Sequence, residues 1–123
     1  MIEKGLKSVL VIEDEPIILL SLTQFLEGEN YSVLAAENGL VALEQLKKHG
    51  TPHLILLDLI MPIMNGSQFA SKFHEHYGLS TPIVVMSAAG DCAQRAVVDH
   101  AVAWISKPFD LNDLLKIVRK YTS

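Results

Sequence analysis

The chain has 123 residues, a formal net charge of −4, and an ordinary composition in which half of the residues are hydrophobic and a fifth are charged. This length fits one domain with a single core and is too short for two. The composition argues against disorder, and the negative charge argues against broad binding to nucleic-acid phosphates. We therefore expect a single domain over residues 1–123 that makes no direct contact with nucleic acid.

Targeting and redox signals point to the cytoplasm. No apolar run approaches the ~20 residues that a membrane helix needs, and the N-terminal stretch lacks the cleavage site of a signal peptide. Cys92 is the only cysteine, so the chain cannot form an internal disulfide, which agrees with a reducing compartment. We expect a cytoplasmic protein that does not bind a membrane.

The first part of the chain predicts two pairs of a strand and a helix. The apolar run Ser8–Ile12 predicts a strand, and Pro16 opens a helix because proline is favoured at the first helical position. Tyr31–Ala35 predicts a second strand, followed by a helix over Leu40–His49 with Asn38 as its N-cap. Apolar residues at helical spacing predict the buried faces of these helices: Ile18, Leu22, Phe25 and Leu26 in the first, and Leu40, Leu43 and Leu46 in the second.

The stretch Leu54–Gly66, LILLDLIMPIMNG, is the most informative in the chain. Its apolar run is short and bounded by proline and glycine, which fits a strand buried on both faces of a parallel sheet. Asp58 ends that run, and taken alone it is as consistent with a turn or a helix cap as with chemistry. A helix follows over Ser67–Tyr77, with core residues at helical spacing: Phe69, Ala70 and Phe73.

Two further strands complete the predicted sheet. Pro82–Met86 is entirely apolar and ends before Ser87, and the shorter run Ala103–Ser106 ends before Lys107. Each strand therefore leads directly into a polar side chain.

The helices of this last part are predicted from their caps. Asp91 is expected to cap a weakly patterned helix that ends near Asp99. Asp110 followed by Asp113 resembles a capping box for the last helix, whose predicted apolar face comprises Leu111, Leu114, Leu115 and Val118. Strict alternation of strands and helices predicts an α/β sandwich of three layers around a five-stranded parallel sheet.

Polar residues directly follow four of the predicted strands: Glu13 and Asp14, Asp58, Ser87, and Lys107. In a parallel sheet these ends meet at one edge, so we expect the side chains to lie close together. Two unit charges about 4 Å apart repel by about 4 kcal/mol at an effective dielectric constant of about 20, so three carboxylates need a proton or a cation. Mg²⁺ suits a few carboxylates with open water positions, whereas the lack of neighbouring Cys or His disfavours zinc and copper.

Lys107 and Ser87 extend this chemistry. A metal, a lysine and a hydroxyl around one carboxylate are the groups needed to stabilise a transferring phosphoryl group, with Asp58 as the nucleophile. The alternative for Lys107 is a plain surface ion pair with an acid, worth about 0–1 kcal/mol.

Four motifs together resemble the receiver domain of two-component response regulators: EDE at Glu13–Glu15, LLDLIMPIMNG at Leu56–Gly66, MSA at Met86–Ala88 and SKPF at Ser106–Phe109. The resemblance covers nearly the whole chain, with the motifs in the family's order. It implies a flavodoxin-like (βα)5 fold with strand order 2-1-3-4-5. It also implies a phosphorylatable signalling domain rather than an enzyme, with only weak self-catalysed phosphotransfer and dephosphorylation. Because Ser123 closes the last helix, we expect no output domain. Two interpretations are left open: a stand-alone regulator that acts through protein contacts, or the receiver piece of a longer chain.

The resemblance implies roles for the residues at the predicted site. Asp58 would accept a phosphoryl group from a phosphohistidine on a sensor kinase or a histidine phosphotransfer protein. Asp14 and Asp58 would bind Mg²⁺ directly, Glu13 through a water molecule, and Ile60 through its backbone carbonyl. Ser87 and Lys107 would each contact a phosphoryl oxygen.

The resemblance also implies how the signal leaves the site. Ser87 and Trp104 would form the switch, with Trp104 at a position where the family usually has Tyr or Phe. Phosphorylation would reshape the surface made by the helix predicted from Asp91, the strand Ala103–Ser106 and the last helix, and this surface would control an unidentified protein or form a homodimer. The alternative for Trp104 is a fixed packing or interface residue.

Two departures from the family pattern affect these expectations. His100 stands where the family commonly has Gly, and a non-glycine residue pays for positive φ, so the turn before the last strand is left open. Ile60 and Ala89 offer no polar group to orient an attacking water molecule, which predicts a long-lived phosphoryl group.

Three alternative functions fit the sequence less well than a working receiver does. A phosphatase of the haloacid-dehalogenase type would need a second acid two residues after Asp58, where this chain has Ile60. A flavin-binding module would need a phosphate-binding loop rich in Gly, Ser or Thr, where this chain has Glu13–Glu15 and Pro16. A degenerate receiver that serves only as a scaffold is disfavoured by the complete set of acids, serine and lysine.

The five histidines are scattered and are interpreted as solvated surface residues. His74 and His76 lie two apart on a predicted helix, so they point to different sides and cannot chelate one ion together.

Overall fold

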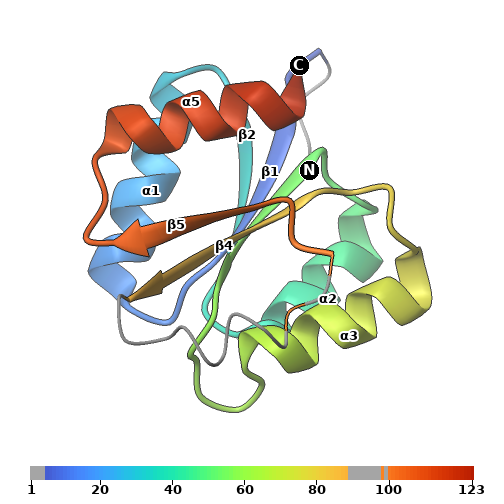
Figure 1. Cartoon of the computed structure of the whole chain (residues 1–123). Helices are drawn as coiled ribbons and strands as arrows, with labels where there is room; N and C mark the ends of the chain where they lie inside the picture. The colour runs from blue at the N-terminus through green and yellow to red at the C-terminus, as the bar shows by residue number, and fades with distance from the viewer. Residues whose placement is uncertain (1–4, 89–97, 99) are drawn as a thin grey trace.

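The computed structural model describes residues 5–88, 98 and 100–123, in which five parallel strands form one sheet with helices on both faces (Figure 1). The strands are β1 (Ser8–Ile12), β2 (Ser32–Ala36), β3 (Leu54–Asp58), β4 (Ile83–Ala88) and β5 (Ala103–Lys107). The described helices are α1 (Pro16–Gly28), α2 (Gly39–His49), α3 (Gly66–Tyr77) and α5 (Leu111–Thr122). The helix expected from Asp91 to about Asp99 lies, apart from Val98, outside the described residues.

The strands are ordered β2-β1-β3-β4-β5. All four neighbouring pairs are parallel, which confirms the α/β class and the flavodoxin-like order. With β3 in the middle of the sheet, the residue at its carboxyl end lies between the ends of β1 and β4. This topology brings residues that are far apart in the sequence to a single edge.

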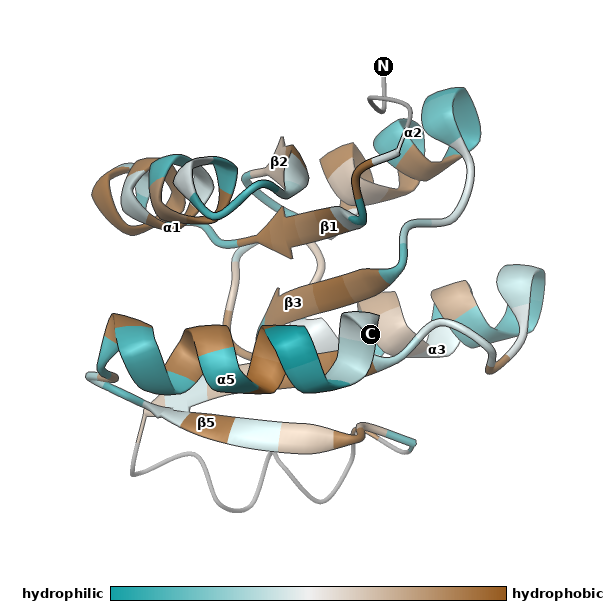
Figure 2. Cartoon of the chain, turned by 90° about the horizontal axis from the view of Figure 1, so that it is seen from above, coloured by the Kyte–Doolittle hydropathy of each residue, from teal (hydrophilic) through white to brown (hydrophobic). Residues whose placement is uncertain are grey.

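Helices form one layer on each face of the sheet (Figure 2). Leu54 and Leu56 of β3 belong to the core packed with α1 and α5, whereas Ile55 and Leu57 belong to the core packed with α2 and α3. Both sets are fully buried, because successive side chains of a strand point to opposite faces. The unbroken apolar run before Asp58 follows from this burial on both sides.

Two predicted helix faces are partly wrong. Leu40 is 46% exposed, and α2 instead buries Gly39, Ala42 and Leu46. The reason is geometric: with 3.6 residues per turn, a spacing of three drifts around the helix, which places Leu40 about 120° from Leu46. Leu111 of α5 is likewise 38% exposed, and the buried face begins at Leu114.

Two predicted N-cap residues, Asn38 and Asp110, cap their helices, but one of the predicted hydrogen-bond patterns differs. The Asn38 side chain accepts a hydrogen bond from the Val41 amide at 2.9 Å, as an N-cap should. Asp110 caps α5 by accepting from the Asn112 amide at 2.6 Å, and the capping box expected with Asp113 is not formed between these two described residues. The aspartate side chain at the third position is one methylene shorter than the glutamate of a capping box.

Several element ends differ from the predicted ones by one or two residues. The second strand begins at Ser32 rather than Tyr31, and β4 runs to Ala88, so that Ser87 lies inside the strand rather than after it. None of the described helices is long and apolar enough to cross a membrane.

Candidate functional site

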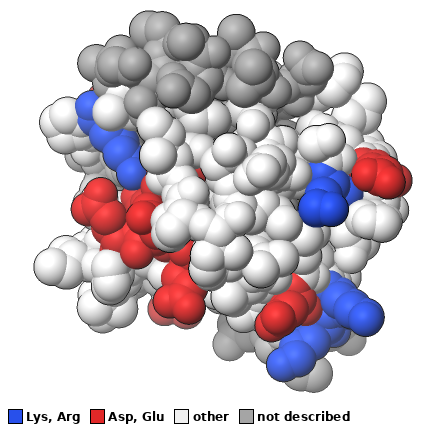
Figure 3. Space-filling model, turned by 90° about the horizontal axis from the view of Figure 1, so that it is seen from below, with Lys and Arg blue, Asp and Glu red and all other residues white. Residues whose placement is uncertain are grey.

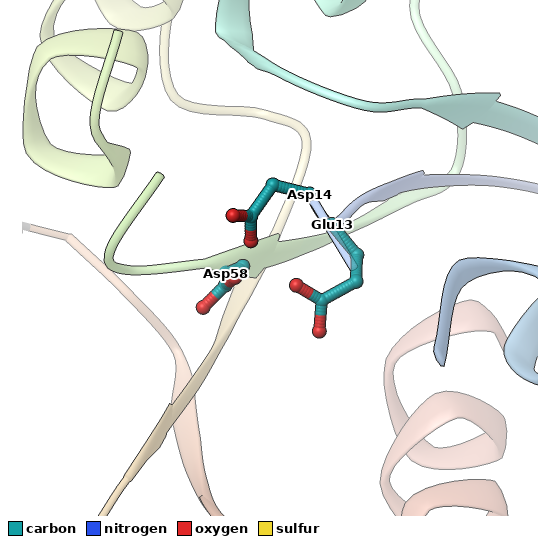
Figure 4. A group of neighbouring side chains, drawn as sticks. All are labelled: Glu13, Asp14 and Asp58. Carbon is teal, nitrogen blue, oxygen red and sulfur yellow. The ribbon is translucent and has the colours of Figure 1, made fainter. Parts of the chain in front are cut away.

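Three carboxylates meet at the carboxyl edge of the sheet (Figure 4). Glu13 and Asp14 directly follow β1, and Asp58 is the last residue of the neighbouring strand β3. One oxygen from each carboxylate lies within 4.8 Å of the other two. Glu13 is completely buried and Asp58 is 5% exposed, while Asp14 is half-buried. The predicted acid cluster is therefore assembled, with only Asp14 substantially open to solvent.

Lys107 reaches the cluster from the end of β5. Its Nζ atom lies 2.6 Å from Glu13 Oε1 and 3.4 Å from Asp58 Oδ1. The lysine therefore forms its short contact with Glu13, and only the longer one with Asp58. Because Glu13 is fully buried and the Lys107 side chain is only 19% exposed, this is a contact within the acid cluster rather than the plain surface ion pair of the alternative.

Burial and the neighbouring charges divide the ionisation within the cluster. Burial raises the pKa of Asp58 from its ordinary value of 3.8 to about 9, with Glu13 adding to the shift and Lys107 opposing it. Burial alone would also raise the pKa of Glu13, but the adjacent Asp58 carboxyl and Lys107 lower it. Burial opposes the charge of Lys107, yet the two acids raise its pKa. Without a cation, Asp58 therefore carries a proton at neutral pH while Glu13 and Lys107 stay ionised.

One buried oxygen of the cluster lacks a hydrogen bond. Glu13 Oε2 is buried and has no hydrogen-bond partner among the described residues. Buried polar atoms are almost always satisfied, so such an atom calls for a ligand. Three carboxylates, two of them deeply buried, form a donor set that suits a hard divalent cation with oxygen ligands. The residues present therefore fit Mg²⁺.

The loop after Asp58 is held close to the sheet by backbone contacts. The Leu59 amide donates to the Met86 carbonyl at 3.1 Å, and the Gly66 amide donates to the Leu59 carbonyl at 2.8 Å. A Cβ atom on Gly66 would lie 2.9 Å from the Asp58 carbonyl oxygen and 2.9 Å from Leu59 Cα, so only glycine fits there. Ile60 lies on this loop and is 53% exposed.

The remaining predicted site residues lie on β4 and β5. Asp58 pairs with Met86 in the sheet register, so Ser87 lies one residue further along the same edge, and it is 1% exposed. Trp104 lies on β5 opposite Val85, where it is half-buried and packs against the core on the α2 and α3 side. Ala89 lies outside the described residues.

The surroundings of the cluster contain features that sequence analysis missed. A cavity of about 400 Å³ lies beside Lys107 and is lined by Glu15, Ile18, Lys107, Pro108 and Phe109. A second cavity of about 260 Å³ lies between Asp14, α1 and the end of β2, and its lining includes Leu19, Leu20 and Ala35. The space-filling view of this face shows acidic side chains gathered with a basic one beside them (Figure 3). The PF dipeptide after Lys107 was the only sequence signal for the larger cavity.

Comparison with known families identifies the family to which this chain belongs. The family model of the response regulator receiver domain matches residues 9–119. The chain belongs to this family. It is a receiver domain of the two-component response regulators, a class that signals through phosphorylation and is not a classical enzyme. Membership of this family argues against the phosphatase and the flavin-binding module that were considered as alternatives.

Individual relatives support this placement of the receiver domain. The transcriptional regulatory protein CrdR of Helicobacter pylori is 31% identical over 117 residues, which cover 94% of this chain and 54% of that protein. The CheY-like receiver domain protein of Methanospirillum hungatei superposes with a TM-score of 0.88 at 26% identity, covering 96% of this chain and 94% of that one. TrrA of Thermotoga maritima, solved in complex with Mg²⁺ and BeF, gives a TM-score of 0.83 at 28% identity, covering 94% and 99%.

The lengths and names of these relatives bear on the expectation that the protein makes no direct contact with nucleic acid. The chain spans about half the length of the curated relatives that it matches. Because some of these relatives are named transcriptional regulatory proteins, the expectation of no direct contact with nucleic acid is not supported.

Proposed function

We propose that Asp58 is the phosphoacceptor of this receiver domain and that its donor is a phosphohistidine on a sensor kinase or a histidine phosphotransfer protein. In this reaction an Asp58 carboxylate oxygen attacks phosphorus, the bond between phosphorus and the histidine nitrogen breaks, and the nitrogen keeps the electron pair. The observation that carries the proposal is the position of Asp58 at the end of the central strand, 3.4 Å from Lys107 and within the three-carboxylate cluster.

The proposed metal site comprises Glu13, Asp14, Asp58 and the backbone carbonyl of Ile60. Bound Mg²⁺ would supply positive charge to the phosphoryl oxygens as charge develops on them. The unsatisfied Glu13 Oε2 atom supports this assignment, because a metal-bound water molecule would satisfy it. Because its pKa is raised, Asp58 holds a proton at neutral pH, and this proton must leave before the carboxylate can act as a ligand or a nucleophile.

Lys107 and Ser87 are proposed to hold the phosphoryl group. Lys107 Nζ donates a hydrogen bond to Glu13 Oε1 at 2.6 Å and lies 3.4 Å from Asp58 Oδ1. Two further negative charges on Asp58 would draw the ammonium group toward the phosphoryl oxygens, while Glu13 keeps its charge for the cation. Ser87, buried at the same edge, would donate its hydroxyl proton to another oxygen.

The output of the domain is proposed to depend on Ser87 and Trp104. Movement of the Ser87 hydroxyl toward the phosphoryl group would free space beside β4, and the half-buried Trp104 ring on the neighbouring strand would move further inward. The affected surface is the one formed by β5, α5 and the segment before β5. This surface would control a downstream protein or form a homodimer of the phosphorylated domain.

The proposal is tested by phosphorylation with a small acyl phosphate in Mg²⁺, followed by intact mass measurement. The wild-type protein is expected to gain one phosphoryl group, and the gain is expected to disappear in Asp58→Asn and on chelation of Mg²⁺. Asp113→Asn makes the same chemical change on an exposed helix position and is expected to be labelled like the wild type. Equal labelling of wild type and Asp58→Asn would refute the assignment.

The phosphoryl group is proposed to be long-lived. Ile60 is an exposed apolar residue two positions after Asp58 and offers no group that could orient an attacking water molecule. The isolated phosphorylated domain is therefore expected to lose its phosphoryl group over minutes or longer, by a self-catalysed reaction that is only weak. The measurement is the intact mass recorded over time after the phosphodonor is removed. Loss of the phosphoryl group within seconds would contradict this expectation.

The single-domain organisation over residues 1–123 also remains a proposal. Since the matched relatives are about twice as long, the test is the mass of the native protein isolated from its cells. A mass equal to that of the sequence given would agree with a stand-alone regulator, and a larger mass would contradict it.

A further inference from the structure

We propose that Glu13 is the positioning residue of Lys107: its Oε1 atom holds the ammonium group away from Asp58, which thereby stays open to the phosphodonor. This role rests on the proposed function of Asp58 and is additional to the proposed role of Glu13 at the metal site. Lys107 Nζ lies 2.6 Å from Glu13 Oε1 and 3.4 Å from Asp58 Oδ1. Charge-assisted N–H···O bonds are about 2.7 to 2.9 Å long, so the contact with Glu13 is a strong hydrogen bond and the contact with Asp58 is not.

Glu13 is fixed in place by its burial and by its backbone. Its side chain is completely buried, and its amide donates a hydrogen bond at 3.0 Å to the carbonyl of Ala36, the last residue of β2. Removing the partner of a buried charge is strongly destabilising, so Glu13 depends on Lys107 as its ion-pair partner. The carboxylate that binds the ammonium group is therefore itself held rigidly.

Packing alone does not fix the ammonium group of Lys107. The residue is the last of β5, its side chain is 19% exposed, and it lines the cavity of about 400 Å³ together with Pro108 and Phe109. The lysine side chain is a flexible stem of four carbons, and beside such a space it can adopt other positions. The place of the ammonium group is therefore set by the carboxylate that binds it.

Glu13 and Asp58 compete for this one ammonium group, and the outcome decides how open Asp58 is. An ammonium group bound tightly to Asp58 would occupy the lone pairs of the nucleophile and the space that the phosphoryl group enters. With Lys107 held by Glu13, Asp58 Oδ1 keeps its lone pairs for the phosphorus atom, and the ammonium group is still near enough to contact the phosphoryl oxygens after transfer. Loss of the charge on Glu13 would transfer Lys107 to Asp58 and slow the reaction.

The test compares the effect of Lys107→Met in three backgrounds on the rate of phosphorylation by a small acyl phosphate in saturating Mg²⁺. In the wild type, Lys107→Met is expected to slow the reaction by about tenfold or more, because a group that stabilises the transferring phosphoryl group is lost. In Glu13→Gln this slowing is expected to disappear or reverse, because there Lys107 covers Asp58 and its removal opens the carboxylate.

Asp14→Asn is the matched control background. It also removes one carboxylate of the cluster, but Asp14 does not form an ion pair with Lys107 among the described residues. In this background Lys107→Met is expected to slow the reaction as it does in the wild type. Equal slowing by Lys107→Met in the Glu13→Gln and Asp14→Asn backgrounds would overturn the proposal.

A second measurement needs neither Mg²⁺ nor phosphorylation. In a chelator, the free energies of unfolding of single and double variants give the coupling of Lys107 to each acid. The coupling with Glu13 is expected to correspond to about tenfold or more in the unfolding equilibrium constant, and the coupling with Asp58 to about threefold or less. In the Glu13→Gln background the coupling between Lys107 and Asp58 is expected to increase.

The coupling of Lys107 with Asp58 requires no change at Glu13, so the proposal stays testable if Glu13→Gln folds poorly. A coupling of Lys107 that is stronger with Asp58 than with Glu13 in the otherwise unchanged protein would overturn the proposal. Absence of phosphorylation at Asp58 would instead contradict the proposed function, and the two failures are therefore distinguishable.

Discussion

At the scale of single residues, the account depends on the conflict between the burial of Asp58 and its charge. The carboxyl group is 5% exposed and lies beside a second, fully buried acid, and its pKa rises to about 9 as a result. The structure therefore favours the neutral form of the residue that must act as a charged nucleophile. A cation at the cluster would resolve the conflict by replacing the proton.

The first consequence concerns the stability of the metal-free protein. In the unfolded chain Asp58 ionises near its ordinary pKa of 3.8, whereas in the folded chain it keeps its proton up to about pH 9. Below about pH 4 Asp58 is neutral in both the folded and the unfolded chain, so its full contribution to stability is present. As the pH rises toward 9 this contribution is lost, because the unfolded chain releases a proton that the folded chain must hold. Asp58→Asn removes this titration and is expected to raise the free energy of unfolding at neutral pH by about 1 to 4 kcal/mol.

Urea unfolding of wild type and Asp58→Asn in a chelator measures this effect. The difference between the two proteins is expected to widen from pH 5 to pH 9 and to shrink when Mg²⁺ is added, because only the wild type gains from the cation. A difference that stays constant with pH would show that Asp58 is ionised in the folded metal-free protein. Asp113→Asn, on the exposed face of α5, controls for the loss of a solvent-exposed carboxylate.

At the scale of elements, the connection between β3 and α3 sets the geometry of the site. Its backbone lies so close to Asp58 and Leu59 that a Cβ atom on Gly66 would approach within 2.9 Å of each. The helix that follows begins with a capping box, in which the Asn65 side chain accepts a hydrogen bond from the Gln68 amide and the Gln68 side chain accepts one from the Asn65 amide. The loop is therefore fixed at both its closest approach and its exit into α3.

Gly66→Ala tests the importance of this close approach. The added methyl group meets backbone atoms that cannot rotate away, so we expect a loss of stability of about 1 to 3 kcal/mol and weaker Mg²⁺ binding. Gly28→Ala is the matched control, because a Cβ atom at the end of α1 has no neighbour within 4 Å. The melting temperature of the control is expected to stay the same or rise slightly, since alanine favours helix. An equally stable Gly66→Ala variant would contradict the proposed fit.

The elements also show what a sequence pattern can predict. The strands β1, β3 and β4 were predictable because each is an apolar run that leads into a polar residue, and an unbroken apolar run is the pattern expected of a strand buried on both faces. Helix faces were less predictable. Leu40 and Leu111 are spaced like members of an apolar stripe, but both are exposed in the structure. The capping box of Asn65 and Gln68 was not predicted, because the pair Asn65-Gly66 equally fits a turn.

At the scale of the whole molecule, the parallel sheet explains why the site could be predicted in advance. Carboxyl ends of parallel strands meet at one edge, so the cluster of Glu13, Asp14 and Asp58 followed once the strands were assigned. Contacts that depend on side-chain reach were not predictable, and the clearest case is Lys107, which makes its short contact with Glu13. The contact between the rings of His74 and His100 was also beyond a sequence pattern, because the two come from separate elements.

The central claim is that the phosphoryl group is carried by Asp58, and its position in the chain can be measured directly. Borohydride reduces an aspartyl phosphate to homoserine, which peptide mass spectrometry locates to a single residue. After phosphorylation in Mg²⁺ and reduction, we predict homoserine at position 58 and at no other position. Homoserine at position 14, or labelling of a residue outside the cluster, would contradict the account.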